Sequence, residues 1–290
     1  MQTALRSLVI AALPSCALFA ACRGGTVPNQ VLTRPVAASA PTPVARTNGP
    51  WSYRPSTQPQ GFVVDQRALI AIRIDTSTQT DTISSHAEVA FTITPSEGGV
   101  SGSVTAFLVQ GAGRAAATPA GLATPFPLRA EYAAHVSQLE FTIPRDATPC
   151  ASNALAVAQS LRDLWFRPPD TLRIGATWQD SSSYVVCRDG IPLHATVRRT
   201  FNVFGTAVGD GRLLLTVSRI SHTTIEGSGT KFGEAVGVNG TGSGQLFYNL
   251  DPASGEVVSA NGNATLELSL RSLLRSQVVR QTVEIRITRS

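Results

Sequence analysis

The sequence predicts a mainly β protein, built as a curved antiparallel sheet or half-barrel of about ten strands packed on one amphipathic helix. Three features predict this fold. After residue 61, polar and apolar residues alternate along most of the chain, and short turn-forming stretches separate the alternating runs. One segment near 152–166 has helical spacing instead. Because short turns join neighbouring strands, we expect the pairing to be antiparallel.

The stretch between residues 82 and 93 has the clearest strand pattern, because every second side chain falls on one mainly apolar face. This face comprises Ile83, Ser85, Ala87, Val89, Phe91 and Ile93. Alternation with a period of two is typical of a strand with one buried face. Further runs of this kind lie at 194–203, 265–270 and 282–287. Hairpin turns are expected at Ser96–Gly99, Asp189–Gly190, Asp210–Gly211 and Asp251–Gly255.

A single amphipathic helix is expected over residues 152–166. Its apolar residues recur at helical spacing: Leu155, Ala156, Ala158, Leu161, Leu164 and Trp165. Ser152 or Asn153 can cap its beginning, and Pro168-Pro169 would stop it. We expect the curved sheet to lay its apolar face over this helix.

Residues 1–21 have the parts of a secretory signal peptide: a short positive region, an apolar segment and small residues at its exit. The apolar segment is shorter than the roughly 20 residues that span a bilayer. The run Leu18-Phe19-Ala20-Ala21-Cys22 resembles a bacterial lipobox, in which the cysteine is acylated and becomes the mature N-terminus. The alternative is an ordinary signal peptide that leaves Cys22 as a spare thiol.

The lipobox resemblance implies acyl chains on Cys22, and two or more such chains give stable anchoring in a membrane. It places the protein in the cell envelope. The absence of Asp after the cysteine favours the outer membrane, with the domain facing the periplasm or the exterior. Residues 22–60 are Pro-rich and would form an extended tether of up to about 100 Å. Residues 61–290 would then form a single β domain.

Four cysteines occur in the sequence, and two of them belong to the N-terminal segment. Cys16 would be removed with the signal peptide and Cys22 acylated, which leaves Cys150 and Cys187 as a pair in an oxidising compartment. A disulfide between them would stabilise the fold by about 3–4 kcal/mol in the chain-entropy model. Two buried thiols are the alternative.

The composition argues against several functional classes. The net charge is only +5, from 24 basic and 19 acidic residues that are scattered along the chain, so we expect no nucleic-acid partner. The four histidines are widely spaced and no metal-binding or dinucleotide motif is present, so no metal and no cofactor are expected. The glycine-rich stretches 227–229 and 237–244 match no phosphate-binding loop and are expected to be loops or bulged strands.

The same search gives no support for an enzyme. The sequence contains no GxSxG motif, which excludes a nucleophile elbow. A catalytic triad can still be assembled in space from distant residues, so a hydrolase is kept as a weaker alternative to a non-enzymatic protein.

The stretch Pro168 to Asp180 contains Gly175 and Trp178 in a Gly-x-x-Trp arrangement. It resembles a signature of uncharacterised bacterial envelope β proteins, and the stretches 242–245 and 251–255 are similar to theirs as well. This resemblance implies no activity. The general architecture is similar to that of half-barrel lipoprotein carriers, whose incomplete barrel encloses an apolar cavity.

Trp165, Phe166 and Trp178 are the candidate ligand-binding residues. Aromatic side chains near a helix-to-strand junction either pack in the core or line a site for an apolar ligand, since such sites are themselves apolar and aromatic. The expected function is that of a membrane-anchored, non-enzymatic envelope lipoprotein that binds an apolar ligand or an envelope partner. The alternative is a structural or assembly lipoprotein that acts by protein–protein contact without a ligand cavity.

Overall fold

The computed structural model describes residues 49–94, 99–120, 122, 124–132, 137–141, 150, 157, 161–188, 190–209, 211–231, 233–273 and 275–290. The expected signal peptide, the lipidation site Cys22 and the tether up to residue 48 lie outside the described residues. Among the described residues, no helix has the length and apolar character needed to cross a membrane.

Strands dominate the described chain, and all but two of them form one antiparallel sheet of 11 strands. Their order in the sheet is β6-β5-β4-β3-β2-β13-β12-β11-β10-β9-β8, while β1 and β7 pair separately. The strands are β1 (Trp51–Ser52), β2 (Gln60–Ile74), β3 (Ser77–Thr94), β4 (Gly99–Gly111), β5 (Phe126–Tyr132), β6 (Ser137–Phe141), β7 (Thr171–Leu172), β8 (Thr177–Arg188), β9 (Ile191–Gly209), β10 (Arg212–Lys231), β11 (Glu234–Asp251), β12 (Glu256–Arg271) and β13 (Ser276–Arg289). The expectation of a mainly β, antiparallel protein is confirmed.

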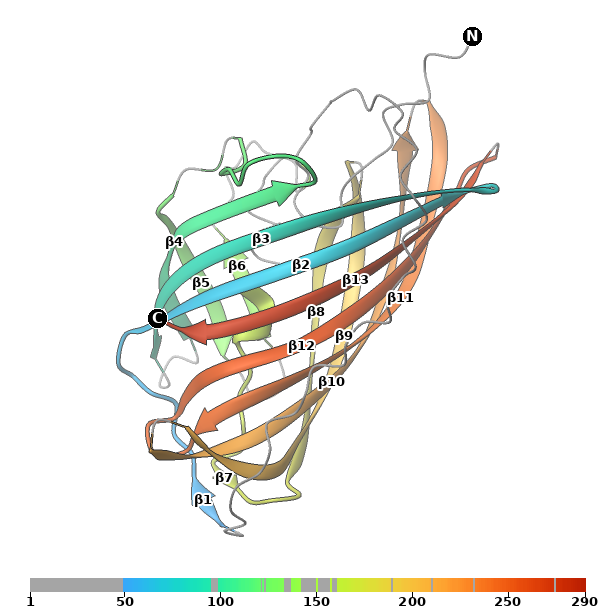
Figure 1. Cartoon of the computed structure of the whole chain (residues 1–290). Helices are drawn as coiled ribbons and strands as arrows, with labels where there is room; N and C mark the ends of the chain where they lie inside the picture. The colour runs from blue at the N-terminus through green and yellow to red at the C-terminus, as the bar shows by residue number, and fades with distance from the viewer. Residues whose placement is uncertain are drawn as a thin grey trace.

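Two meanders make up the sheet, and they are joined by its first and last long strands. β2 to β6 form one meander and β8 to β13 the other, and β2 pairs with β13 in the middle of the sheet. The backbone N–H of Ser290 donates to the carbonyl of Gly61 at 3.0 Å, so the chain ends beside the start of β2. Figure 1 shows this junction, with β13 lying against β2.

The sheet curls on itself without closing. Its edge strands β6 and β8 approach each other until some of their Cα atoms lie within 8 Å. No ladder of backbone hydrogen bonds joins these two strands over the residues that the structure describes. In Figure 1 the strands β2, β3, β13 and β12 cross the front of the molecule, and β8 and β9 lie behind them.

The alternating pattern of β3 has its expected effect on burial. All six residues of the predicted apolar face are at most 7% exposed, whereas His86 and Glu88 between them point outward and are more exposed. The same alternation holds in β9, where Ala195, Val197, Phe201 and Val203 are buried. The concave face of the curl is therefore the apolar face, as period-two patterning requires.

The segment before β2 is docked on the domain. Trp51 pairs with Leu172 in the small sheet, and Tyr53 is 4% exposed. The hydroxyl of Tyr53 donates to the carbonyl of Gly255 at 3.2 Å. Gly255 has a φ of +71°, and a Cβ there would lie only 1.6 Å from the carbonyl oxygen of Arg54, so this position requires glycine. The folded unit thus includes residues before the expected domain start at 61.

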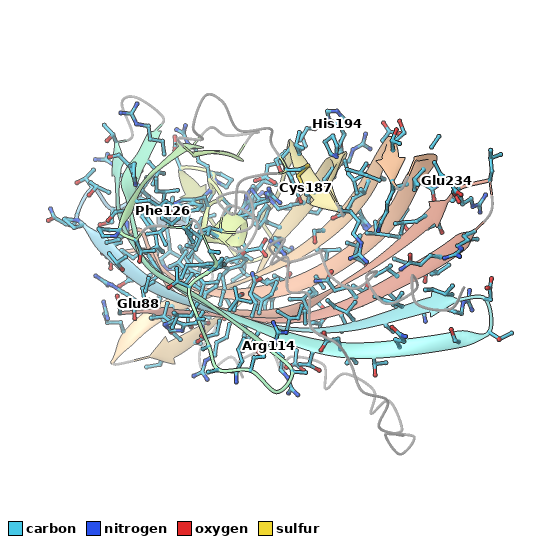
Figure 2. The ribbon with its side chains drawn as sticks, turned by 90° about the horizontal axis from the view of Figure 1, so that it is seen from above. Glu88, Arg114, Phe126, Cys187, His194 and Glu234 are labelled. Carbon is cyan, nitrogen blue, oxygen red and sulfur yellow. A yellow bond between two sulfur atoms is a disulfide. The ribbon has the colours of Figure 1, made fainter. Side chains whose placement is uncertain are left out.

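The connection from β6 to β8 differs from the predicted helix. Residues 151–156 and 158–160 lie outside the described residues. Of the described ones, Val157 and Leu161 are helical, and Arg162–Leu164 form a 3₁₀ turn. Trp165 is already extended, with φ −112° and ψ 126°, so the prediction of a helix through Phe166 is wrong. The residue before a proline disfavours helical backbone, and Pro168-Pro169 shortens the segment from that side. The 3₁₀ turn lies inside the curl (Figure 2).

Cys150 and Cys187 form a disulfide, with an S–S distance of 2.14 Å and a Cα–Cα distance of 5.4 Å. This confirms the expected pairing. The bond attaches the connection to the edge strand β8 near its end, where Figure 2 labels Cys187.

Two further expectations concern turns and glycines. The turn at Asp251–Gly255 is confirmed: the Asp251 carboxylate accepts backbone N–H groups of Ala253 at 2.9 Å and Ser254 at 3.3 Å. The glycine-rich stretches 227–229 and 237–244 lie within β10 and β11, so they are strands and not loops.

Candidate functional site

The three candidate aromatic residues are brought together on the concave face. Trp165 and Phe166 come from the connection and are 1% and 4% exposed. Trp178 begins β8, and its ring lies 6.4 Å from that of Phe166 and 5.0 Å from that of Phe201, stacked on it at 3°. The Trp165 ring lies 5.3 Å from that of Phe91 on β3. The connection therefore reaches both walls of the curl and forms a continuous apolar core with them.

A buried ion pair fixes the connection to the sheet. Arg199 on β9 donates through Nε and Nη2 to the two carboxylate oxygens of Asp180 on β8, at 2.6 Å and 2.5 Å. Its third nitrogen, Nη1, donates to the backbone carbonyl of Trp165 at 3.1 Å. Both charged side chains are almost completely buried, at 2% and 3% exposed. The guanidinium thus holds the extended backbone after the 3₁₀ turn in place.

A second charged pair acts one strand further along. Arg219 on β10 pairs with the Asp163 carboxylate, and the Tyr248 hydroxyl donates to the Asp163 carbonyl at 2.9 Å. Burial alone would raise the pKa of Asp163, but the charge of Arg219 outweighs it and lowers this pKa below its ordinary value. Burial raises the pKa of Tyr248 to about 12. Asp163 is therefore ionised and Tyr248 neutral at physiological pH.

The sequence pattern did not assign these charged residues to the interior. Arg199 lies on the inward face of β9 between Val197 and Phe201, and its neighbours on this face are apolar. An arginine among the inward-facing apolar residues of a strand is the sequence signal that could have identified this buried pair. A buried charge requires a partner of opposite charge.

The far half of the concave face carries a different lining, which we call the aliphatic cluster. It lies toward the β2–β3, β10–β11 and β12–β13 hairpins and comprises Ala68, Ile70, Ile72, Ile83, Ile191, Leu193, Ala195, Ile225, Val236, Val238, Leu268, Leu270 and Val279. Every one of these residues belongs to a strand of the large sheet. Its buried residues are all aliphatic and at most 9% exposed, and none of them belongs to the described connection. The partly buried Tyr184 packs against it, and the guanidinium of Arg162 from the connection lies over the Tyr184 ring.

Three buried polar groups also face inward from β3 and β13. Ser85, Gln277 and Gln281 are 5%, 7% and 4% exposed. Their Oγ, Nε2 and Oε1 atoms have no hydrogen-bond partner among the described residues. An unpaired buried polar group costs about 1–3 kcal/mol, so these three atoms have hydrogen-bonding capacity that the described residues do not use.

On the outer face, a hollow of about 410 Å³ contains the one histidine with two carboxylate neighbours among the described residues. His86 Nδ1 lies 2.8 Å from Asp65 Oδ1, and Nε2 lies 3.5 Å from Glu88 Oε1. The hydrogen bond with Asp65, supported by Glu88, raises the pKa of His86. Because Nε2 faces a carboxylate and not a hydroxyl, this pair lacks the arrangement of a catalytic triad.

We predict that His86 makes stability depend on pH. A raised folded-state pKa stabilises the protein fully below the unfolded value of about 6.5, and this contribution is lost as pH rises through the folded value. The effect should stay under about 1 kcal/mol because the pair is exposed. Urea unfolding between pH 5 and 9 should show that His86→Gln removes this slope. His222→Gln, at an exposed position of β10, is the control, and an equal change in both variants would contradict the assignment.

Within the described ranges, no group of three or more His, Cys, Asp or Glu side chains is arranged to hold a metal ion. The fold and the site together define the class: a mainly β protein with an open, curled antiparallel sheet whose concave face is apolar and is divided between an aromatic and an aliphatic half.

Comparisons with known proteins identify no family for this chain. No protein-family model matches the chain, and no curated protein matches it. Among solved structures, DynF from the dynemicin biosynthesis pathway of Micromonospora chersina is 8% identical, covers 88% of this chain and 92% of its own, and has a TM-score of 0.23. OccK2 (OpdF) of Pseudomonas aeruginosa in complex with glucuronate is 12% identical, covers 81% and 69%, and has a TM-score of 0.18. Likenesses this weak define neither a fold family nor a function.

Proposed function

We propose that this chain is a membrane-anchored, non-enzymatic lipoprotein of the cell envelope whose curled sheet binds an apolar ligand. The anchor is inferred from the lipobox-like sequence ending at Cys22. The ligand site is inferred from the aliphatic cluster, which is the observation that carries the proposal. On this view the sheet is a half-barrel on the outer membrane, with its connection filling one half of the concave face and a ligand occupying the other.

The chemistry of the concave face supports an apolar ligand with a small polar end. The cluster is entirely aliphatic, as suits acyl chains, and the unpaired atoms of Ser85, Gln277 and Gln281 offer hydrogen bonds without charge. Ligand sites typically combine a mainly apolar lining with a few polar groups that fix orientation. The Trp165, Phe166 and Trp178 group would then form the inner wall of the site, between the ligand and the connection.

Two alanines of equal burial test this proposal. Ala68 and Ala87 are both 0% exposed and point inward from the neighbouring strands β2 and β3, but Ala68 belongs to the aliphatic cluster and Ala87 to the aromatic one. If a ligand occupies the aliphatic half, Ala68→Phe should displace it and keep the free energy of unfolding within about 1 kcal/mol. Ala87→Phe should instead lose about 1–3 kcal/mol, because it overpacks a filled core.

The measurement is native mass spectrometry of the purified Cys22→Ser chain, followed by solvent extraction, with urea unfolding of both alanine variants. We expect a lipid-sized adduct on the parent and on Ala87→Phe but not on Ala68→Phe. A parent without adduct, together with equal destabilisation by the two substitutions, would contradict a ligand site.

That result would favour the second candidate, an assembly lipoprotein without a cavity. The observation behind this candidate is the pair of edge strands, β6 and β8, which form no ladder with each other over the described residues. Exposed edges can accept a strand from a partner protein.

A further inference from the structure

The turn between β12 and β13 carries the most exposed large hydrophobic residue of the described chain. Leu273 is 98% exposed, compared with 54% for Val208, 47% for Ile220 and 37% for Leu69. It lies at the end of the sheet far from the C-terminus, where the β2–β3 and β12–β13 hairpins reach their tips side by side (Figure 1). Contact of a fully exposed leucine side chain with water is unfavourable, and at a projecting tip this exposure does not stabilise the fold.

The turn is also well defined. The backbone N–H of Ser272 donates to the carbonyl of Arg275 at 2.9 Å, and the N–H of Arg275 donates to the Ser272 hydroxyl at 3.2 Å. These bonds join the two sides of the β12–β13 turn that contains Leu273. Tight hairpin loops favour Gly, Asn and Asp, because these residues adopt the required backbone conformations most easily. A leucine at this position departs from the residue preferences of tight turns and gains no packing contacts in return. Departures of this kind are typical of functional sites.

Positive charge surrounds this leucine. Arg271 and Arg275 flank it in the sequence and are exposed, and Arg73 is exposed beside them near the end of β2. Among the described residues, none of these three guanidinium groups forms an ion pair. Asp75 is the one acidic residue of the two neighbouring turns. The turn therefore presents an exposed leucine together with exposed arginine side chains.

We infer that this hairpin tip is a contact site for an anionic lipid surface, in which Leu273 enters the boundary between headgroups and acyl chains while Arg271 and Arg275 bind lipid phosphates. Arginine side chains can keep their charge at the headgroup level while their stems lie along apolar surface. Each basic residue near an anionic membrane contributes about 1 kcal/mol of binding.

The size of the apolar surface at this turn favours a lipid surface over a protein partner. A stable protein interface buries about 800 Å² on each side around a packed hydrophobic centre. The turn supplies only two leucines, Leu273 and Leu274, next to exposed arginines, and these are too few to form such a centre. A fluid bilayer needs no shape complementarity, and its binding grows with the apolar area inserted and with the number of basic residues.

The contact would lie far from the docked N-terminal segment. The docked N-terminal segment reaches Gly255 at the β11–β12 turn, whereas Leu273 follows the opposite end of β12. Figure 2 shows the length of the strands between these ends, with Glu234 at the far end from Phe126. A 20-residue strand such as β10 extends about 66 Å at roughly 3.3 Å per residue. The tip is therefore a second membrane contact, separate from the one inferred at Cys22.

The test is co-sedimentation of the full chain with phosphatidylcholine vesicles, with and without phosphatidylglycerol. All variants carry Cys22→Ser, so residues 1–48 are identical and their contribution cancels. We expect Leu273→Asn to weaken vesicle binding about tenfold, since full burial of a leucine is worth about 1.5–3 kcal/mol and 1.4 kcal/mol is tenfold. Asparagine suits a tight turn, so the substitution should leave the fold intact.

A matched control lies at the opposite end of the sheet. Val208 is 54% exposed beside the β9–β10 turn, and Val208→Asn should leave vesicle binding unchanged. The double substitution Arg271→Gln and Arg275→Gln should abolish the preference for phosphatidylglycerol vesicles, and added salt should do the same to the parent.

Two results would overturn the inference. One is vesicle binding by Leu273→Asn at the level of the parent. The other is a parent that sediments as a dimer without lipid and becomes monomeric on Leu273→Asn, because the tip would then be a contact between protein copies.

Discussion

Replacing Asp180 by Ala is expected to lower the free energy of unfolding by about 3–5 kcal/mol, because the substitution leaves the Arg199 guanidinium buried without its counter-charge. Arg199 is 2% exposed and makes three hydrogen bonds, two to Asp180 and one to the backbone of Trp165. Water cannot replace the lost carboxylate at this burial. Urea unfolding followed by tryptophan fluorescence measures the loss, and near-ultraviolet circular dichroism reports the packing of Trp165 and Trp178.

An exposed pair of the same kind provides the control. Arg280 on β13 bonds Glu267 on β12 through Nε and Nη2, but the two side chains are 71% and 47% exposed. Glu267→Ala should therefore cost under about 1 kcal/mol. If Asp180→Ala cost no more than this control, the buried pair would not hold the connection in place.

Replacing Cys22 by Ser is expected to move nearly all of the protein out of the membrane fraction, since serine cannot carry the thioether-linked lipid. Two or more acyl chains anchor stably, whereas a single chain gives only marginal binding. A high-salt wash of the membranes removes electrostatic contacts, including those inferred for the Leu273 tip. Fractionation with this wash, together with the mass of the N-terminal peptide, measures the change.

The other cysteines are the controls for this result. Cys16→Ser should keep the protein in the membrane fraction, because the proposed cleavage before Cys22 would remove this residue. The paired change Cys150→Ser and Cys187→Ser removes only the disulfide and should also keep it there. Persistent membrane association of Cys22→Ser after the wash would rule out the anchor at this position.

The fold class was predictable because apolar and polar residues alternate with a period of two along the strand sequences. In β3 every second residue from Ile83 to Ile93 is buried, and in β12 and β13 Leu268, Leu270 and Ile287 are buried as the pattern required. The Asp251–Gly255 turn was predictable because an Asx side chain and a glycine are the local chemistry of a turn. The cysteine pair followed from counting the cysteines that would remain after the expected cleavage and acylation at Cys22.

The rest depends on contacts between distant residues, which a local pattern does not contain. The helical backbone has already ended at Trp165, which is extended and whose carbonyl accepts a hydrogen bond from Arg199, a residue far along the chain. The division of the concave face also depends on the path of the connection across the curl. The candidate aromatic residues were found because they lie near the expected helix-to-strand junction, but their charged partners were not.

The pairing of β2 with β13 has a consequence for how the protein is made. Because β13 follows the other described strands in the sequence, the two meanders stay separate until β13 has been synthesised. Pairings between residues this far apart in sequence are slow to form, because a large loop must close first. The joining of the two meanders is therefore expected to be a late step in the folding of this sheet.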